Sequence, residues 1–159
     1  MNYEHIPHHW INRLGFVIRR DLAALFRASG HPISAEEWAV LLVLWQHGPQ
    51  SPSVLAEITI KDRTTITRLL DAMVRKSLVQ RDEDPKDRRR SVVRLTPRGA
   101  GLKGDLVPLA RGLIDQSMAG IPPEDIAVTL RTLQAMTHNL VPHTSDLERD
   151  QLPPKEGSK

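Results

Sequence analysis

The chain has 159 residues, of which 40% are hydrophobic and 26% charged, and its formal net charge is +3 at pH 7. This length supports one domain with a hydrophobic core and additional helices, rather than two independent domains. No run of 18 apolar residues exists and the N-terminus lacks a secretory pattern, so we expect a cytoplasmic protein with no contact to a membrane. The absence of cysteine excludes disulfide bonds, thiolate metal sites and cysteine nucleophiles.

The N-terminal part is predicted to form a helix over residues 8–29. Apolar side chains recur there at intervals of three and four residues, which places them on one face: Ile11, Leu14, Ile18, Leu22 and Leu25. Gly30 and Pro32 match the residues that commonly end a helix. The apolar face requires a partner to cover it.

A second helix is expected to begin after Ser34, which forms a capping-box pattern with Glu37. Gly48 ends it. Trp38 and Trp45 lie on its apolar face, where packing in the core is their more common role.

A short third helix follows, because Ser51 and Pro52 have the types preferred at an N-cap and at the first helical position. Residues 59–61 then lead directly to Asp62, which begins a longer basic helix. Short helix, tight turn and longer helix are the order of a helix-turn-helix.

Positive charge is concentrated in residues 61–98. This quarter of the chain holds 12 of the 22 Lys and Arg residues but only 6 of the 19 Asp and Glu residues, so the remainder is net negative. Such a concentration is typical of a surface that binds a polyanion.

The basic helix after Asp62 buries one face, formed by Ile66, Leu69, Leu70, Met73 and Val74. Its other face and first turn carry hydroxyls and guanidinium groups, the types that contact bases and phosphates. The candidate DNA-binding residues here are Arg63, Thr64, Thr65, Thr67, Arg68 and Arg75. Taken alone, the pattern also fits a solvated surface helix.

A hairpin is predicted next, with strands at residues 78–81 and 91–96. The nine residues between them are too polar for a core and must project into solvent. Three consecutive arginines, Arg88, Arg89 and Arg90, can then reach a phosphate backbone or a minor groove. The alternative is an ordinary solvated hairpin with local ion pairs.

Two more helices are expected at residues 97–120 and 122–141, the first with a kink near residues 104–108 caused by Pro108. With residues 8–29, they give three apolar faces that a small domain cannot cover. We expect them to close on a second copy of the chain in a two-fold dimer, the alternative being an intramolecular three-helix bundle.

Residues 62–99 resemble the winged helix-turn-helix of the MarR family of bacterial transcription regulators. The most specific motif is Asp87-x-Arg89, followed by a short strand, Leu95-Thr96 and Gly99. In element order and length the likeness extends from about residue 10 to 141.

One position departs from this family. Similar regulators usually have glycine where this chain has Ser77, at the end of the recognition helix. Ser77 must either adopt the left-handed conformation at some energetic cost or end the helix differently.

The predicted fold is therefore mainly α with a small β-hairpin wing: a winged helix-turn-helix flanked by N- and C-terminal dimerisation helices. The expected parts are an N-terminal dimerisation helix (1–30), a DNA-binding domain (31–98), C-terminal dimerisation helices (99–141) and a flexible tail (142–159).

The predicted function is sequence-specific binding of double-stranded DNA as a homodimeric, ligand-responsive repressor of a pseudo-palindromic operator. We expect Thr64, Thr65 and Arg68 to face base edges and the other helix candidates to contact phosphates or flanking bases. The resemblance assigns Arg89 to the minor groove and Asp87 to orienting it, with Arg88 and Arg90 on phosphates.

The resemblance also implies a small, often aromatic and anionic effector between the dimerisation helices and the winged helix. Trp10 and Trp38 would wall its pocket, and Arg13 or Arg20 would pair with a carboxylate. Packing in a core explains the same residues without a ligand.

We find no Walker loop, GxSxG, HExxH or dinucleotide motif, so neither an enzyme nor a cofactor is expected. Histidines near both ends of the chain would form a zinc site only if the termini met in a dimer, and none is predicted. Two other classes remain open, a winged helix that binds an acidic protein and a small-molecule binding protein.

Overall fold

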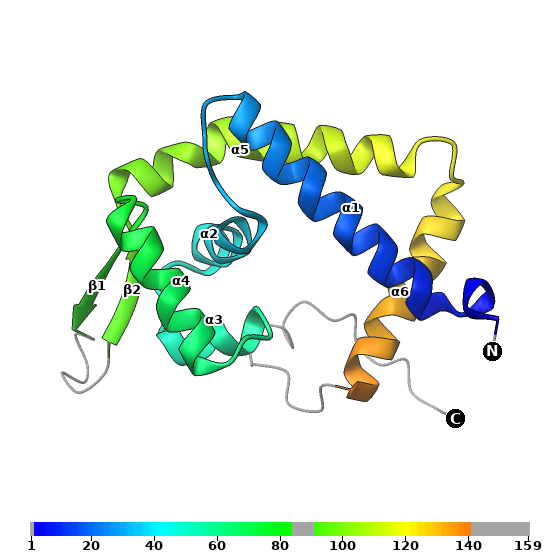
Figure 1. Cartoon of the computed structure of the whole chain (residues 1–159), viewed down its shortest axis with the longest axis horizontal. Coiled ribbons are helices and arrows are strands. Elements are labelled where there is room, and N and C mark those ends of the chain that lie inside the picture. The colour runs from blue at the N-terminus through cyan, green and yellow to red at the C-terminus, as the bar shows by residue number, and fades with distance from the viewer. Residues whose placement is uncertain (1, 84–90, 141–159) are drawn as a thin grey trace.

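The computed structural model describes residues 2–83 and 91–140. Over these residues it confirms a mainly α fold with one two-stranded antiparallel hairpin (Figure 1). No helix in this part of the chain is long and apolar enough to cross a membrane. The elements are η1 (Tyr3–His5), α1 (Pro7–Ala28), α2 (Ala35–His47), α3 (Pro52–Ile58), α4 (Arg63–Arg75), β1 (Val79–Glu83), β2 (Ser91–Leu95), α5 (Pro97–Met118) and α6 (Pro123–Leu140).

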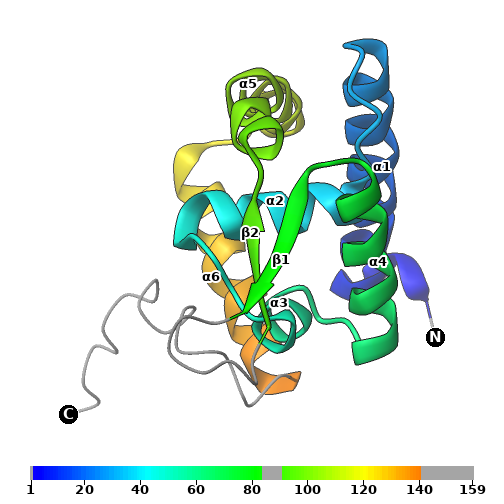
Figure 2. The same ribbon diagram turned by 90° about the vertical axis from the view of Figure 1, so that its left-hand side faces the viewer.

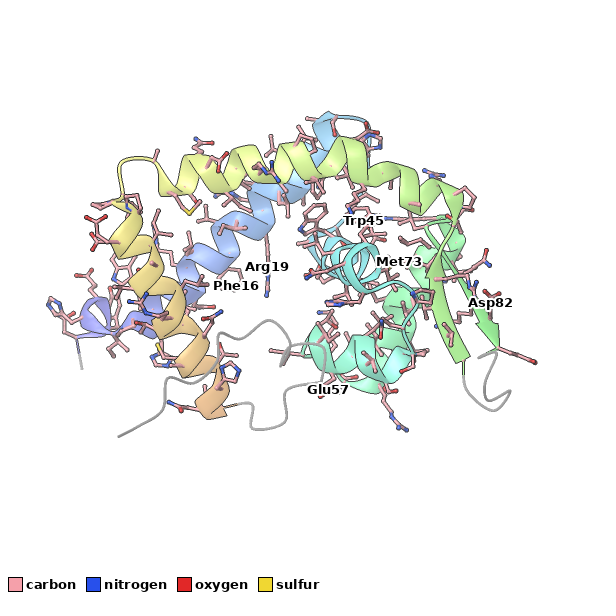
Figure 3. All side chains as sticks on the ribbon, turned by 180° about the vertical axis from the view of Figure 1, so that it is seen from behind. Phe16, Arg19, Trp45, Glu57, Met73 and Asp82 are labelled. Carbon is pink, nitrogen blue, oxygen red and sulfur yellow. The ribbon has the colours of Figure 1, made fainter. Side chains whose placement is uncertain are left out.

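One hydrophobic core lies among α2, α3, α4 and the hairpin, and the C-terminal end of α1 and the first half of α5 close it. Phe26 of α1 is fully buried, and its ring centroid lies 5.1 Å from that of Trp38. Trp45 continues the cluster at 5.6 Å from Trp38, and Figure 3 shows Trp45 and Met73 within this packed region. The expected core role of both tryptophans is therefore observed.

The predicted caps are present. Ser34 and Glu37 form a complete capping box at α2, and the side chains of Ser51, Asp62 and Thr96 each accept a backbone N–H at the start of α3, α4 and α5. Strand β1 runs to Glu83, two residues beyond the predicted end, and pairs with β2 from Val79 opposite Leu95 to Glu83 opposite Ser91.

Ser77 takes the left-handed conformation, with φ of 56°. The amide of Leu78 then donates to the carbonyl of Met73 at 2.9 Å, which closes the end of α4 as a glycine would. Ile60, in the turn between α3 and α4, is also left-handed at 52°. Both residues are strained, because a Cβ disfavours this conformation.

Gly99 allows α5 to begin against the hairpin. A Cβ at this position would lie 2.0 Å from the carbonyl oxygen of Leu78, so no other residue fits without movement of the backbone. The Gly99 carbonyl accepts a hydrogen bond from Trp45 Nε1 at 3.0 Å. Pro108 lies inside α5 as predicted, and Figure 1 shows the helix curving along its length.

The apolar faces of α1 and α6 are largely uncovered within one chain. Leu22 is the one member of the predicted α1 face that is fully buried, whereas Leu14 is 52% exposed. Helix α6 buries no residue, and Figure 2 shows it standing apart from α1. The described chain therefore does not form the intramolecular three-helix bundle.

Candidate nucleic-acid interface

The start of α4 is organised by Asp62. Its carboxylate accepts the backbone N–H of Thr65 at 2.8 Å and the Thr65 hydroxyl at 2.7 Å. The bond from the Thr65 side chain, followed by that from its backbone, lowers the pKa of Asp62 below its ordinary value. The Thr65 hydroxyl proton is therefore engaged, and only its oxygen lone pairs are open to a ligand.

The six helix residues predicted to contact DNA are all exposed along α4. Arg63, Arg68 and Arg75 make no ion pair with any residue that the structure describes. Thr67 donates its hydroxyl proton to the carbonyl of Arg63 at 2.7 Å. Thr64 is thus the one threonine of this face whose hydroxyl proton is not used by the described residues.

On the opposite face Ile66, Leu70 and Met73 are buried as predicted. Leu69 is partly buried, and Val74 is 40% exposed, so the buried face is narrower than its apolar sequence indicated. Helix α4 is anchored by these three side chains, and this leaves its polar face outward.

A hollow of about 680 Å³ lies beside this face. Arg63 and Thr67 of α4 line one side, Ser91 and Val92 of β2 line another, and residues 49–54 lie at the start of α3. The first turns of α4, the base of the hairpin and the beginning of α3 therefore form one concave surface.

Arg81 joins the hairpin to α4. Its Nη2 forms an ion pair with Asp71 Oδ1 at 2.9 Å and donates a hydrogen bond to the Thr67 carbonyl at 3.3 Å. Asp71 is the acidic residue on the polar face of α4, and Arg81 balances its charge. Arg81 was not predicted as part of this surface, because a contact between a strand and the preceding helix leaves no periodic signal in the sequence.

Lys76, at the C-cap of α4, was also missed. Its Nζ lies 2.8 Å from both Oε1 and Oε2 of Glu37 and 2.9 Å from the carbonyl oxygen of Pro32. The capping box identified Glu37 from the sequence, but nothing in the pattern connects it with a lysine 39 positions away.

The wing candidates Asp87, Arg88, Arg89 and Arg90 lie outside the described residues. The described base of the hairpin carries an ion pair between Arg94 and Asp82 and a hydrogen bond from Gln80 to the same carboxylate at 3.1 Å.

The residues expected to hold an effector are not brought together within one chain. Trp38 packs against Phe26 near the C-terminal end of α1. Trp10 lies near the N-terminal end of the same helix, about 24 Å from Phe26 at the ordinary helical rise. Trp10 is 56% exposed, and its Nε1 donates to the Glu4 carbonyl at 2.9 Å.

The two arginines of that site differ. Arg20 pairs with Asp21 at 2.7 Å, which raises its pKa through the hydrogen bond and the charge of the carboxylate. Arg13 is exposed and makes no ion pair among the described residues. Figure 3 shows Phe16 and Arg19 projecting from the same helix, where they line a small hollow of about 240 Å³.

Within the described residues no group of three acidic or histidine side chains could hold a metal ion.

An exposed basic helix, packed on a helix-turn-helix core and followed by a hairpin, defines the class of winged helix-turn-helix DNA-binding proteins. The MarR family model matches residues 33–91. The transcriptional repressor NicR of Pseudomonas putida is 28% identical over 138 residues, which cover 84% of this chain and 87% of NicR.

Solved structures agree. A MarR family regulator from Silicibacter pomeroyi is 26% identical with a TM-score of 0.76, covering 91% of this chain and 96% of that one. BpsR of Bordetella bronchiseptica, whose DNA binding is described as regulated by 6-hydroxynicotinic acid, is 23% identical with a TM-score of 0.76, covering 86% and 96%.

Residues 33–91 therefore carry a MarR family domain, and the fold of the chain is that of the solved MarR family regulator. Members of this family are transcriptional regulators and not enzymes.

Proposed function

We propose that this protein is a homodimeric repressor that binds a pseudo-palindromic duplex through α4 and the wing. The observation that carries the proposal is the exposed face of α4, where Arg63, Arg68 and Arg75 have no acidic partner among the described residues. Unpaired guanidinium groups beside a concave surface suit phosphates and guanine edges.

The proposed roles of the α4 residues follow from their exposure, and those of the wing residues follow from the resemblance to the MarR family. Arg68 and Thr64 read base edges, and Thr65 accepts a hydrogen bond there because its proton is engaged. Arg63, Thr67 and Arg75 contact phosphates or flanking bases. In the wing, Arg89 enters the minor groove, Asp87 orients it, and Arg88 and Arg90 meet phosphates.

A second copy of the chain is the proposed cover for α1 and α6. The supporting observation is the number of large apolar side chains left exposed along these helices and the end of α5, far more than an isolated surface requires. They include Trp10, Ile11, Leu14, Phe16, Val17, Leu25, Ile114, Ile121, Val128, Leu130, Leu133 and Leu140. The division into dimerisation helices (1–30 and 99–141), a DNA-binding domain (31–98) and a tail (142–159) belongs to this proposal.

An aromatic, anionic effector is the proposed signal that releases DNA. Trp10 and Arg13 are exposed three positions apart on α1, where a partner chain can complete the pocket that one chain does not form. Arg20, further along α1, and Trp38 of α2 would also contribute to this pocket. Such an effector must bind more weakly to the DNA complex than to the free dimer.

The test begins with a duplex that the protein itself selects from a randomised pool. Fluorescence anisotropy then compares this duplex with a scrambled one across a salt series. We expect a preference of about 10³-fold, and Arg68→Ala should lose most of it. Arg111→Ala, on the exposed side of α5, removes the same charge and should retain the preference. Equal binding to both duplexes, or no enrichment, would overturn the proposal.

A further inference from the structure

The C-terminal end of α4 is held in place by Lys76, whose ammonium group contacts three oxygen atoms. Lys76 Nζ contacts both carboxylate oxygens of Glu37 at 2.8 Å and the carbonyl of Pro32 at 2.9 Å. Two of these contacts, those with Oε2 and with the Pro32 carbonyl, are hydrogen bonds from the three N–H donors of the ammonium group. While they hold, the charge of Lys76 is paired with the Glu37 carboxylate.

The partner carboxylate is buried. Glu37 is only 3% exposed and the one charged or polar residue of the described chain in the core. It also accepts the amide of Ser34 at 2.9 Å in the capping box, and this fixes its position at the start of α2. A buried carboxylate requires such partners, because burial without them is strongly unfavourable.

The contact joins two parts of the molecule that are far apart in sequence. Pro32 lies in the segment that leaves α1, directly after the Gly30 turn that ends that helix. His31 of the same segment lies 3.4 Å from Asp105 of α5. Lys76 thereby ties the end of α4 to the segment between α1 and α2, which itself contacts α5.

We infer that Lys76 and Glu37 are positioning residues that set the angle of α4 for base recognition without touching DNA. This rests on the proposed function, since it concerns how the same surface reads its duplex. Replacing a buried ion pair by apolar residues is often close to neutral for stability. We therefore assign this pair, whose carboxylate is buried and whose lysine is 40% exposed, to the geometry of the helix that carries Arg68 and Arg75. Ser77, next along the chain, is held in its strained conformation by the same end of the helix.

The decisive variant is the double replacement Glu37→Gln and Lys76→Met. It removes one negative and one positive charge, so the net charge is unchanged, and glutamine still completes the capping box. The control is Arg111→Met with Asp115→Asn, which removes one exposed positive and one exposed negative charge of α5 and leaves the net charge unchanged.

Three quantities are measured for parent, double variant and control: affinity for the selected duplex, affinity for the scrambled duplex, and amide exchange of the free protein. We expect the double variant to bind the selected duplex at least 10-fold more weakly, with scrambled binding and the salt dependence unchanged. Its Ser77 and Leu78 amides should exchange at least 10-fold faster while those of α2 do not. The control should match the parent throughout.

The inference is overturned if selected-duplex affinity stays within twofold of the parent, or if the salt dependence falls by one charge, which would make Lys76 a direct phosphate contact. Equally faster exchange at every amide would show a general structural role and overturn it as well. If the double variant does not fold, Glu37→Gln alone decides, with a smaller loss of the same kind expected. If the parent protein selects no duplex, the proposed function is overturned. The exchange rates of the Ser77 and Leu78 amides then test separately whether Lys76 and Glu37 hold the end of α4 in place.

Discussion

The winged helix and the pair of helices α1 and α6 differ in how much of their apolar surface is buried within one chain. In the first, buried side chains such as Leu41, Leu70 and Val93 have 0% exposure and the helix caps are complete. In the second, α6 buries nothing and most of the apolar face of α1 is open. A single chain therefore builds the winged helix by itself, whereas the remaining apolar surface is the part that the proposed second copy would cover.

The largest effect is expected from breaking the proposed dimer. Leu130→Asp places a charge in the exposed apolar face of α6, where Leu130 is 56% exposed in one chain. We expect a monomer by analytical ultracentrifugation and a loss of selected-duplex affinity of about 10²-fold or more, because two linked half-site contacts become one.

Asn139→Asp is the matched control, since nine residues place it on the opposite side of α6. It should remain dimeric. A Leu130→Asp variant that stays dimeric would contradict the role given to this face.

Within the winged helix and its core, we expect Gly99→Ala to be the small substitution that lowers stability most. Its Cβ would meet the Leu78 carbonyl at 2.0 Å, and overpacking of this kind costs about 1–3 kcal/mol. Urea unfolding measures the loss. Gly101→Ala, with no atom near its Cβ, should instead raise stability by about 0.5–1 kcal/mol. Equal effects of the two substitutions would contradict the close approach.

A gain of stability is expected where the chain is strained. Ser77→Gly relieves a left-handed Cβ at φ of 56° and should stabilise the fold by about 1 kcal/mol, less the entropy that glycine adds to the unfolded chain. Thermal unfolding compares Ser77→Gly, which relieves the backbone strain, with Ser77→Ala, which retains it. No difference between them would show that Ser77 is unstrained.

The smallest expected effect concerns acid. The folded pKa of Asp62 lies below its ordinary value, so its contribution to stability is complete above that ordinary value and is lost as pH falls through the lower, folded one. Below about pH 4 the parent should lose stability faster than Asp62→Asn, which caps α4 but does not titrate. Parallel pH profiles in urea unfolding would contradict the cap.

Local signals predicted much of the fold. Capping residues such as Ser34, Ser51 and Thr96 act within three positions of themselves, so their types already determine where helices begin. The left-handed Ser77 was one of two outcomes that its position allowed, and the structure selects between them.

The candidate site was predictable only in part. Helical spacing identified the exposed face of α4, but it did not show that the hydroxyl protons of Thr65 and Thr67 are engaged locally. The contacts of Arg81 with Asp71 and of Lys76 with Glu37 depend on tertiary packing, which no short pattern encodes. The exposure of Val74 was not predicted for the same reason, since helical spacing placed it on the buried face and it is 40% exposed.

The most direct test of this account is the stoichiometry of the complex with the selected duplex, measured by sedimentation equilibrium at a protein concentration well above the dissociation constant. We predict two chains on each duplex, and we expect the Leu130→Asp variant not to form that complex at the same concentration. One chain on each duplex, bound by the parent with full sequence preference, would contradict it.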